Sequence, residues 1–262
     1  MPKRFAHDDD VDRLEKNRID TRRIKEKDSN DLKVVESVFD KATVLTIDKL
    51  IRKGILKKLV GIVSTGKEAN VYLAKNPEDV DLAVKIFRTH SEFRKYALPY
   101  IEGDYRFKLK RKDSRSVTYV WTLKEFKNLK LAEACGVRVP SPIAVRNNVL
   151  VMEFIGTDGI PAPRMKDIPP ENPEKIFPLI IECISRLYHQ AKLVHADLSE
   201  YNVLIHNDAP VLIDISQGVL LHHPHSKKFL LRDVNTIVTF FNKLGVITPH
   251  SKEIFNKIIK ET

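Results

Sequence analysis

The sequence lacks the features of a membrane protein and of a disulfide-stabilised protein. It contains no run of about 18 uninterrupted apolar residues, so no segment is expected to span a membrane. Residues 1–10 are charged and offer no apolar stretch for a signal peptide. The only two cysteines, Cys135 and Cys183, stand far apart in apolar helical patterns, so we expect both to be reduced core residues. These absences favour a cytoplasmic protein.

Positive charge is in excess. The chain has 45 Lys and Arg residues against 35 Asp and Glu residues, which gives a formal net charge of +10. Such a surface favours acidic partners, which include nucleotide phosphates, RNA and acidic proteins. The charge does not choose among these partners, and a charged fraction of 31% also fits the salt-rich surface of a thermostable protein.

The apolar pattern divides the chain into three parts. Residues 1–31 alternate acidic and basic side chains with little apolar content, so we expect a flexible charged segment. Residues 32–151 start with helical spacing and continue as strands, whereas residues 152–262 are mostly helical. This order predicts an α+β protein with a small β-rich lobe, a helical lobe and a cleft between them.

Capping and turn residues predict the individual elements. Thr46 is expected to cap a short helix that Gly54 ends, and Ser116 to cap a longer helix that runs to Ala134. Residues 88–115 carry many charges without a sustained period and predict a long flexible loop. Further helices are expected over 34–39, 176–190, 228–243 and 249–260. Strands are expected over 59–73 with a turn at Gly66, over 82–87, 143–145 and 149–154, and over 203–205 and 211–213 with a turn at 208–210.

A lysine stands at the end of one short apolar run. Residues 82–84 precede Lys85, downstream of the turn at Gly66. A lysine in this position needs an anionic partner, and the best candidate is Glu125, which flanks the apolar stripe of the next long helix. The pattern matches the V-A-I-K strand of protein kinases, whose lysine binds phosphates and pairs with a helix glutamate. An ordinary surface salt bridge is the alternative.

Residues 195–202 read His-Ala-Asp-Leu-Ser-Glu-Tyr-Asn and match the kinase catalytic loop H-R-D-L-x-x-x-N. Asp197 would accept or orient the proton of a substrate hydroxyl. Asn202 would ligate a metal ion, and His195 would fix the loop by bonding to the backbone. The match is specific because the loop follows a predicted helix and precedes a short apolar strand.

Asp214 ends the apolar run 211–213, downstream of the catalytic loop. A hard oxygen ligand at this point suits Mg²⁺ or Mn²⁺. Alone, Asp214 could be a capping or surface residue, but matching motifs in the expected order argue for a metal site. Asp197 and Asp214 are therefore the predicted catalytic residues, and Asn202 and Asp214 the predicted metal ligands.

The nucleotide-binding segments carry weaker signals. The loop at 64–71 keeps only Gly66 of the three glycines in the usual phosphate-covering motif, although small residues at the other positions still permit close backbone approach. Residues 151–155 would join the lobes and bind the adenine edge through backbone groups. The predicted nucleotide-binding residues are Ser64, Thr65, Gly66, Lys67, Lys85, Glu125, Glu153 and Ile155.

Three segments together resemble the RIO family of atypical protein kinases, in its first subgroup and in a compact, archaeal-like form. They are residues 64–72, 195–202 and 213–217. The resemblance covers about residues 35–250 and implies a trimmed bilobal kinase fold. The β-rich N-lobe would have extra N-terminal helices, and the short helical C-lobe would lack the activation segment, as the absence of an A-P-E motif after Asp214 also indicates.

The resemblance also implies a function. Family members use ATP with Mg²⁺ or Mn²⁺, phosphorylate Ser and Thr in proteins including themselves, and act in small ribosomal subunit maturation. The residue that matches Asp214 can itself become phosphorylated during ATP hydrolysis. The expected partners of this chain are thus a protein substrate, the pre-ribosomal small subunit and its rRNA, without a membrane.

Two alternatives stay open. A small-molecule kinase of the aminoglycoside or choline type would share the H-x-D-x-x-x-x-N loop, but such enzymes usually need a helical insertion for which this chain is short. A scaffold that binds RNA or ribosomes with a vestigial nucleotide site would not need to retain Lys85, Asp197, Asn202 and Asp214. The basic run 108–112 is a candidate RNA surface, and a solvated loop is its plainer interpretation.

Overall fold

The computed structural model describes residues 39–260. The flexible segment predicted for residues 1–31, and all but the last residue of the helix predicted for 34–39, lie outside this range. The chain consists of two compact units, and the boundary between them follows Val44. The lobes and the cavity described below belong to the part that follows.

The first described helix, α2 (Lys41–Arg52), starts earlier than the sequence predicts. The Asp40 carboxylate accepts a hydrogen bond from the Thr43 backbone N–H at 2.7 Å and thereby caps the helix. Thr46 therefore lies inside α2, and the prediction that it is the cap is wrong. Gly54, with a φ of 68°, adopts the left-handed conformation just beyond the helix, as predicted.

Five antiparallel strands form the β-rich lobe, in the order β1-β2-β3-β5-β4. All five match strands predicted from the sequence. The central strand β3 is buried along almost its whole length, and its register places Lys85 between Val71 of β2 and Leu150 of β5. The strands are β1 (Lys58–Thr65), β2 (Ala69–Lys75), β3 (Asp81–Phe87), β4 (Pro142–Arg146) and β5 (Val149–Glu153).

Residues 88–115 do not form a single long loop, and that prediction is wrong. Helix α3 (Ser91–Glu102) occupies the first half of the segment and packs against the long helix that follows. The charged residues and Pro99 that lie within α3 obscure its helical period in the sequence. Its buried residues are spaced by four: Phe93, Ala97 and Ile101.

The long helix α4 (Ser114–Ala134) is capped by Asp113, whose carboxylate accepts the Ser116 backbone N–H at 3.0 Å. Ser116 also donates its hydroxyl to that carboxylate at 2.7 Å, so it lies in the first turn and is not the predicted cap. The centre of α4 buries polar as well as apolar side chains. The buried charged and amide residues are Lys124, Glu125 and Asn128.

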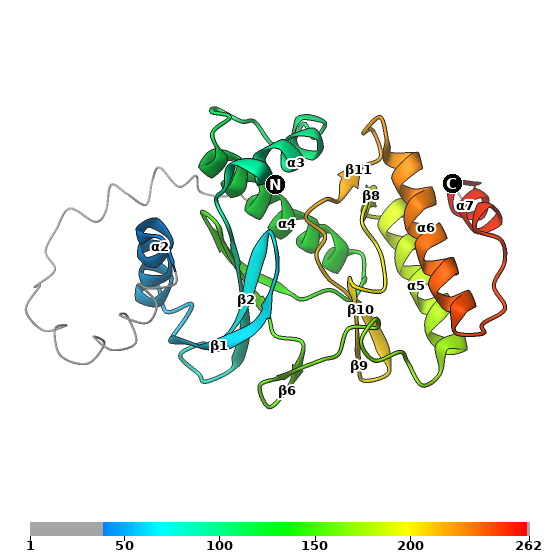
Figure 1. Ribbon diagram of the computed structural model, residues 1–262, viewed down its shortest axis with the longest axis horizontal. Helices are drawn as coiled ribbons and strands as arrows, with labels where there is room; N and C mark the ends of the chain where they lie inside the picture. The colour runs from blue at the N-terminus through cyan, green and yellow to red at the C-terminus, as the bar shows by residue number, and fades with distance from the viewer. Residues whose placement is uncertain (1–38, 261–262) are drawn as a thin grey trace, which may run out of the picture. The chain divides into compact units, whose positions relative to one another are not determined.

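The helical lobe is built on α6, which packs against both α5 and α7 (Figure 1). No helix within residues 39–260 is both long and apolar enough to cross a membrane. The helices are α5 (Pro173–His189), α6 (Ser226–Lys243) and α7 (Ser251–Lys260). The short strands are β6 (Gly156–Thr157), β7 (Ile160–Pro161), β8 (Leu193–Val194), β9 (Val203–His206), β10 (Ala209–Leu212) and β11 (Val219–Leu220).

Two predictions for the helical lobe need correction. The hairpin between β9 and β10 turns at Asn207 and Asp208, with φ angles of 52° and 54°, so Pro210 lies in β10 and outside the turn. Helix α5 begins at Pro173, earlier than predicted, and therefore contains Pro178 beyond its first turn. Proline is favoured at the first helical position because its missing N–H would be unpaired there in any case.

The cysteines are free thiols, as predicted. Both are only partly buried: they pack against the main core but are not among its buried residues, which corrects that part of the prediction. Cys135 is the C-cap of α4, and Cys183 lies on α5. Burial raises the pKa of the Cys183 thiol to about 11, so it stays protonated at neutral pH.

The chain between Asp214 and α6 is short. Only residues 215–225 separate them, and strand β11 occupies part of this segment. The activation segment of larger kinases has no room here, as the missing A-P-E motif predicts.

Replacing Phe93 with Ala tests whether α3 is docked as described. Phe93 is 3% exposed, and its ring meets the ring of Trp121 edge to face at 5.6 Å. Loss of a buried phenyl group lowers the free energy of unfolding by about 3–5 kcal/mol. Trp121 is the only tryptophan in the chain. Its fluorescence during denaturant unfolding therefore measures the loss and reports directly on the contact with α3.

The matched control is Ile247→Ala, because Ile247 is 100% exposed and should leave both stability and emission unchanged. Phe93→Ala protein with the stability and tryptophan emission of the parent would show that α3 does not pack on α4.

Candidate active site

A cavity of about 610 Å³ lies between the sheet and the helical lobe. Its walls come from β1, β2, β3 and β5 on one side and from the segments after β8 and β10 on the other. Every residue that the sequence predicts to bind nucleotide, ligate metal or catalyse lines this cavity. These residues are Ser64, Thr65, Gly66, Lys67, Lys85, Glu125, Glu153, Ile155, Asp197, Asn202 and Asp214.

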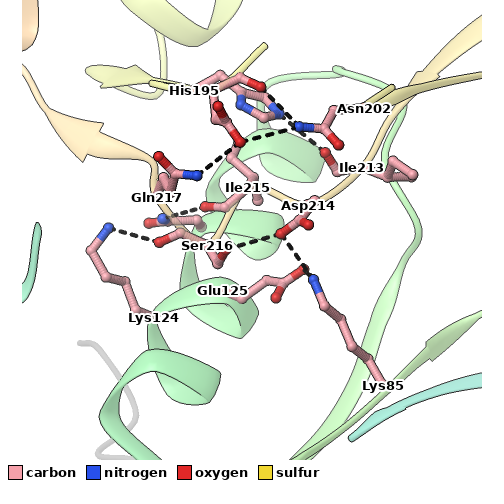
Figure 2. A network of polar contacts seen from close by, with 12 residues as sticks. Lys85, Lys124, Glu125, His195, Asn202, Ile213, Asp214, Ile215, Ser216 and Gln217 are labelled. Atoms are coloured by element: carbon pink, nitrogen blue, oxygen red, sulfur yellow. Dashed lines mark hydrogen bonds and ion pairs between the residues drawn. The ribbon is translucent and has the colours of Figure 1, made fainter. Parts of the chain in front are cut away.

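Lys85 lies between two carboxylates (Figure 2). Its Nζ atom is 2.8 Å from Oε1 of Glu125 on α4 and 2.9 Å from Oδ1 of Asp214, which follows β10. The side chains of Lys85 and Glu125 are only 9% and 1% exposed, so the alternative of a surface salt bridge is wrong. The contact with Asp214 joins a cation of the sheet to an anion of the helical lobe.

The two carboxylates fix the protonation state of Lys85. Burial alone would lower its pKa, but Asp214 and Glu125 outweigh this effect and raise it. Burial also opposes the ionisation of Asp214, yet Lys85 and the Ser216 hydroxyl hold the pKa of this carboxyl below its usual range. Burial together with the charge of Asp214 raises the pKa of Glu125 to about 7 in spite of Lys85. At neutral pH the site therefore holds an ammonium beside an ionised Asp214.

Asp197 is held by hydrogen bonds from one residue of the catalytic loop and one residue outside it. The Asn202 side-chain amide donates to the Asp197 backbone carbonyl at 2.8 Å, which closes the loop on itself. The Gln217 amide donates to Oδ2 of Asp197 at 2.8 Å. Burial and the nearby charge of Asp214 raise the pKa of Asp197, which favours a role in accepting or orienting a proton.

Helix α6 anchors the backbone of the same loop. The buried carboxylate of Asp233 accepts the backbone N–H groups of Ala196 at 2.8 Å and of Leu198 at 3.1 Å. Arg232 donates to the Ala196 carbonyl, and Ala196 itself has a φ of 65°. These contacts stabilise a left-handed conformation that is unfavourable for a residue with a Cβ atom.

His195 has the structural role predicted for it. Its Nε2 atom lies 3.1 Å from the backbone carbonyl of Ile213 (Figure 2). Burial lowers the pKa of His195 to about 4, so the ring is neutral at physiological pH. A neutral ring with its proton on Nε2 donates to that carbonyl, and it links the catalytic loop to the residue just before Asp214.

Three residues that line the cavity were missed at the level of sequence. Gln217 lies in a recognised segment, but its amide role depends on a fold-back that spacing does not reveal. Tyr96 was missed because α3 was predicted as a loop. Glu68 lies within the phosphate-covering loop, and burial with the negative charge of Asp214 raises its pKa to about 7.

The segment between the lobes offers a backbone donor to a ligand. Glu153 is immobilised because its carboxylate binds Arg138 at 2.6 and 2.5 Å and accepts the Ser141 N–H at 3.1 Å. The Ile155 carbonyl accepts the Ala162 N–H at 2.9 Å. The Ile155 N–H has no backbone acceptor among residues 39–260, so it can bind the edge of a ligand ring.

The predicted metal ligands fit a hard cation. Hydrogen bonds engage Oδ1 of Asp214 and Nδ2 of Asn202, which leaves one oxygen of each of these cavity-lining side chains without a hydrogen-bond partner in the described part of the chain. No three His, Cys, Asp or Glu residues in that part are grouped to hold a metal by themselves. Two protein oxygens suit Mg²⁺, which completes its shell with water and substrate phosphates.

Comparison with known proteins identifies close relatives. A family model described as "RIO domain" matches residues 70–254. The chain is 43% identical over 241 residues to RIO-type serine/threonine-protein kinase Rio1 of Haloferax volcanii, covering 91% of this chain and 83% of that protein. It is 42% identical over 216 residues to Rio1 of Methanocaldococcus jannaschii, covering 82% and 74%.

Eukaryotic relatives are longer. Serine/threonine-protein kinase RIO1 of Saccharomyces cerevisiae is 34% identical over an aligned length of 287 residues. The match covers 99% of this chain and 58% of the yeast protein. The chain thus spans a little over half of that relative.

A similar solved structure is the Rio2 kinase of Chaetomium thermophilum, described as an ADP/Mg²⁺-phosphoaspartate complex. Its TM-score is 0.63 at 21% identity, and the match covers 82% of this chain and 65% of that one. At this identity the similarity speaks for the fold alone. It confirms the predicted α+β, protein-kinase-like fold with a β-rich N-lobe and a helical C-lobe.

Proposed function

Because the chain belongs to the RIO family of serine/threonine-protein kinases, we propose that it transfers the γ-phosphate of ATP to Ser or Thr hydroxyls, its own included, in the cavity described above. The observation that carries this proposal is the position of Lys85 between Glu125 and Asp214. Phosphoryl transfer needs a cation at the phosphates and carboxylates that hold a metal ion and orient the attacking hydroxyl. The cavity brings both together.

Each residue has a distinct task in this reaction. Lys85 binds phosphate oxygens, and Glu125 keeps its ammonium in place. Asp197, held by Gln217 and Asn202, orients the attacking hydroxyl and accepts its proton. The Ile155 N–H binds the adenine edge.

Asp214 and Asn202 would hold Mg²⁺, or Mn²⁺ with the same oxygen donors. The bound ion would neutralise charge on the phosphate oxygens. The Rio2 kinase of Chaetomium thermophilum is described as a complex with ADP and Mg²⁺, which supports the binding of nucleotide and Mg²⁺ by this chain.

We also propose that the chain hydrolyses ATP through a phosphorylated Asp214. The Rio2 structure is described as containing a phosphoaspartate. Lys85 and Ser216 orient the Asp214 carboxylate at the cavity wall. Attack of its free oxygen on the γ-phosphorus would form an acyl phosphate as the bond to ADP breaks, and water would later release phosphate and restore Asp214. Such a cycle would act as a conformational switch.

The proposed setting is the maturation of the small ribosomal subunit in the cytoplasm. Residues 108–112 support contact with rRNA because their basic side chains are exposed between α3 and α4. The short segment after Asp214 supports a substrate that docks elsewhere than on an activation segment.

Asp197→Ala and Asp214→Ala separate transfer from binding. Asp197→Ala should lower the rate of autophosphorylation by a factor of about 10²–10⁴ and leave ADP affinity unchanged, because it removes only the proton acceptor. Asp214→Ala should weaken ADP binding in the presence of Mg²⁺ but not in its absence. Radiolabelled phosphate transfer and calorimetric titration measure the two effects.

The control is Glu171→Ala, an exposed carboxylate outside the cavity, which should change neither quantity. Normal phosphate transfer by Asp197→Ala protein would contradict the catalytic assignment. Turnover of sugars, choline or aminoglycosides in place of protein would favour the small-molecule kinase. A chain that binds no nucleotide at all would favour the scaffold.

The acyl phosphate on Asp214 has a chemical signature. Protein incubated with γ-labelled ATP and Mg²⁺ should retain label that hydroxylamine releases, whereas phosphoserine and phosphothreonine resist this reagent. Asp214→Asn should abolish the hydroxylamine-sensitive label because the amide is a poor nucleophile. Sensitive label that persists in Asp214→Asn would place the phosphate on another carboxylate.

The rRNA contact predicts a steep salt dependence. The logarithm of the binding constant for small-subunit rRNA should fall linearly with the logarithm of the salt concentration. Replacing Lys108, Lys110 and Arg111 with Ala should lower the magnitude of this slope by up to about three units. The surface control is Lys252→Ala on α7, which should have no effect. An unaltered slope in the triple variant would exclude this surface.

A further inference from the structure

A buried lysine outside the phosphotransfer motif holds the segment that follows Asp214. Lys124 of α4 is 0% exposed. Its ammonium donates to the backbone carbonyls of Ser216, at 3.1 Å, and of Gly218 (Figure 2). Burial of an ammonium among neutral acceptors is costly, and nothing in the phosphotransfer chemistry described above uses this group. Its position therefore calls for a role in the segment it contacts.

Asn128 lies one helical turn further along α4 and binds the same segment. Its Nδ2 atom donates to the carbonyls of Ile215 at 2.9 Å and of Gly218 at 3.1 Å. Its Oδ1 atom accepts from Arg106 at 2.8 Å, which fixes the orientation of the amide. Three carbonyls in residues 215–218 are thus bound by two side chains of α4.

The side chains of the same segment hold both catalytic carboxylates. The Ser216 hydroxyl donates to Oδ1 of Asp214 at 2.9 Å. The Gln217 amide donates to Oδ2 of Asp197 at 2.8 Å. A shift of the backbone between these residues would therefore move the metal ligand and the proton acceptor together.

Gly218 completes the arrangement. A Cβ atom at this position would come within 2.9 Å of Nδ2 of Asn128 and 3.0 Å of the Ile215 carbonyl oxygen. The segment can approach α4 this closely only with glycine here.

The charge on Lys124 is weakly compensated. Burial lowers the pKa of Lys124 to about 7, although the charge of Asp104 opposes this effect. A neutral amine keeps two N–H donors, enough for the two carbonyls, so the contacts persist in either protonation state.

We propose that Lys124 and Asn128 are positioning residues that hold residues 215–218 and thereby set Asp197 and Asp214 for metal-dependent phosphoryl transfer. This inference rests on the proposed function. The adjacent Glu125 contacts Lys85, so one turn of α4 positions the phosphate-binding cation and, through the backbone of this segment, both carboxylates.

Lys124→Met tests this role, because methionine keeps an unbranched chain of similar length and removes the donors. The dissociation constant of ADP is measured by calorimetry with and without Mg²⁺, together with kcat and KM for autophosphorylation. The dissociation constant of ADP without Mg²⁺ should stay unchanged, because Lys124 donates its hydrogen bonds to the carbonyls of Ser216 and Gly218 and not to the adenine-binding segment. The tightening caused by Mg²⁺ should fall by about 10–100-fold, as for other groups that orient metal ligands, with a loss in kcat.

Lys130→Met is the matched control on the same helix, since Lys130 is exposed and its ammonium lies over the Phe126 ring, 4.9 Å from the ring centre. It should behave as the parent protein. Asn128→Leu is the second variant and should reproduce the Mg²⁺-specific loss; it keeps the proposal testable if Lys124→Met fails to fold.

The outcomes separate the inference from the function on which it rests. A parent protein whose ADP binding does not respond to Mg²⁺ would overturn the proposed function and this inference together. A responsive parent with folded variants that respond equally would overturn the inference alone. Equal weakening with and without Mg²⁺, accompanied by a lower melting temperature, would show a purely structural role and would also overturn it.

Discussion

The ammonium of Lys85 is buried between the two lobes, and the arrangement of the active site depends on how its charge is compensated. Its side chain is 9% exposed, and an isolated ion in such a place costs several kcal/mol. Glu125 from α4 and Asp214 from the end of β10 both lie within 3 Å of Nζ. The compensation therefore ties the sheet, the long helix and the metal-binding segment to one point, which is where phosphate oxygens would be neutralised.

Helix α4 contacts both the sheet and the segment that follows Asp214. Glu125 contacts the cation of the sheet, while Lys124 and Asn128 bind the backbone that follows Asp214. Helix α6 does the same for the catalytic loop, because Asp233 binds two of its backbone N–H groups. The functional carboxylates are thus held by backbone contacts from two helices, so the short segment between Asp214 and α6 needs no further chain to order it.

The sequence predicts which residues gather at the cavity better than it predicts the helices around them. Lys85 stands in a fixed motif within β3, and Asp197, Asn202 and Asp214 stand in fixed motifs beside the short apolar strands of the other lobe. Neighbouring strands and loops bring these residues together. Errors arise where neighbouring residues offer more than one cap for a helix, or where charged residues hide its apolar period. Thr46 and Ser116 can each cap a helix, but Asp40 and Asp113, a few residues earlier, supply the carboxylates that accept the first backbone N–H groups. The charges of α3 conceal a period of four that only the packing against Trp121 reveals. Gln217 could not be assigned a role because its contact with Asp197 joins residues that are distant along the chain.

A crystal structure with a non-hydrolysable ATP analogue and Mg²⁺ tests the central claim most directly. The account predicts that the metal ion is bound by side-chain oxygens of Asp214 and Asn202, and that Lys85 donates to a phosphate oxygen while it keeps its contact with Glu125. A nucleotide bound outside the cavity, or a metal ion that neither Asp214 nor Asn202 contacts, would contradict it.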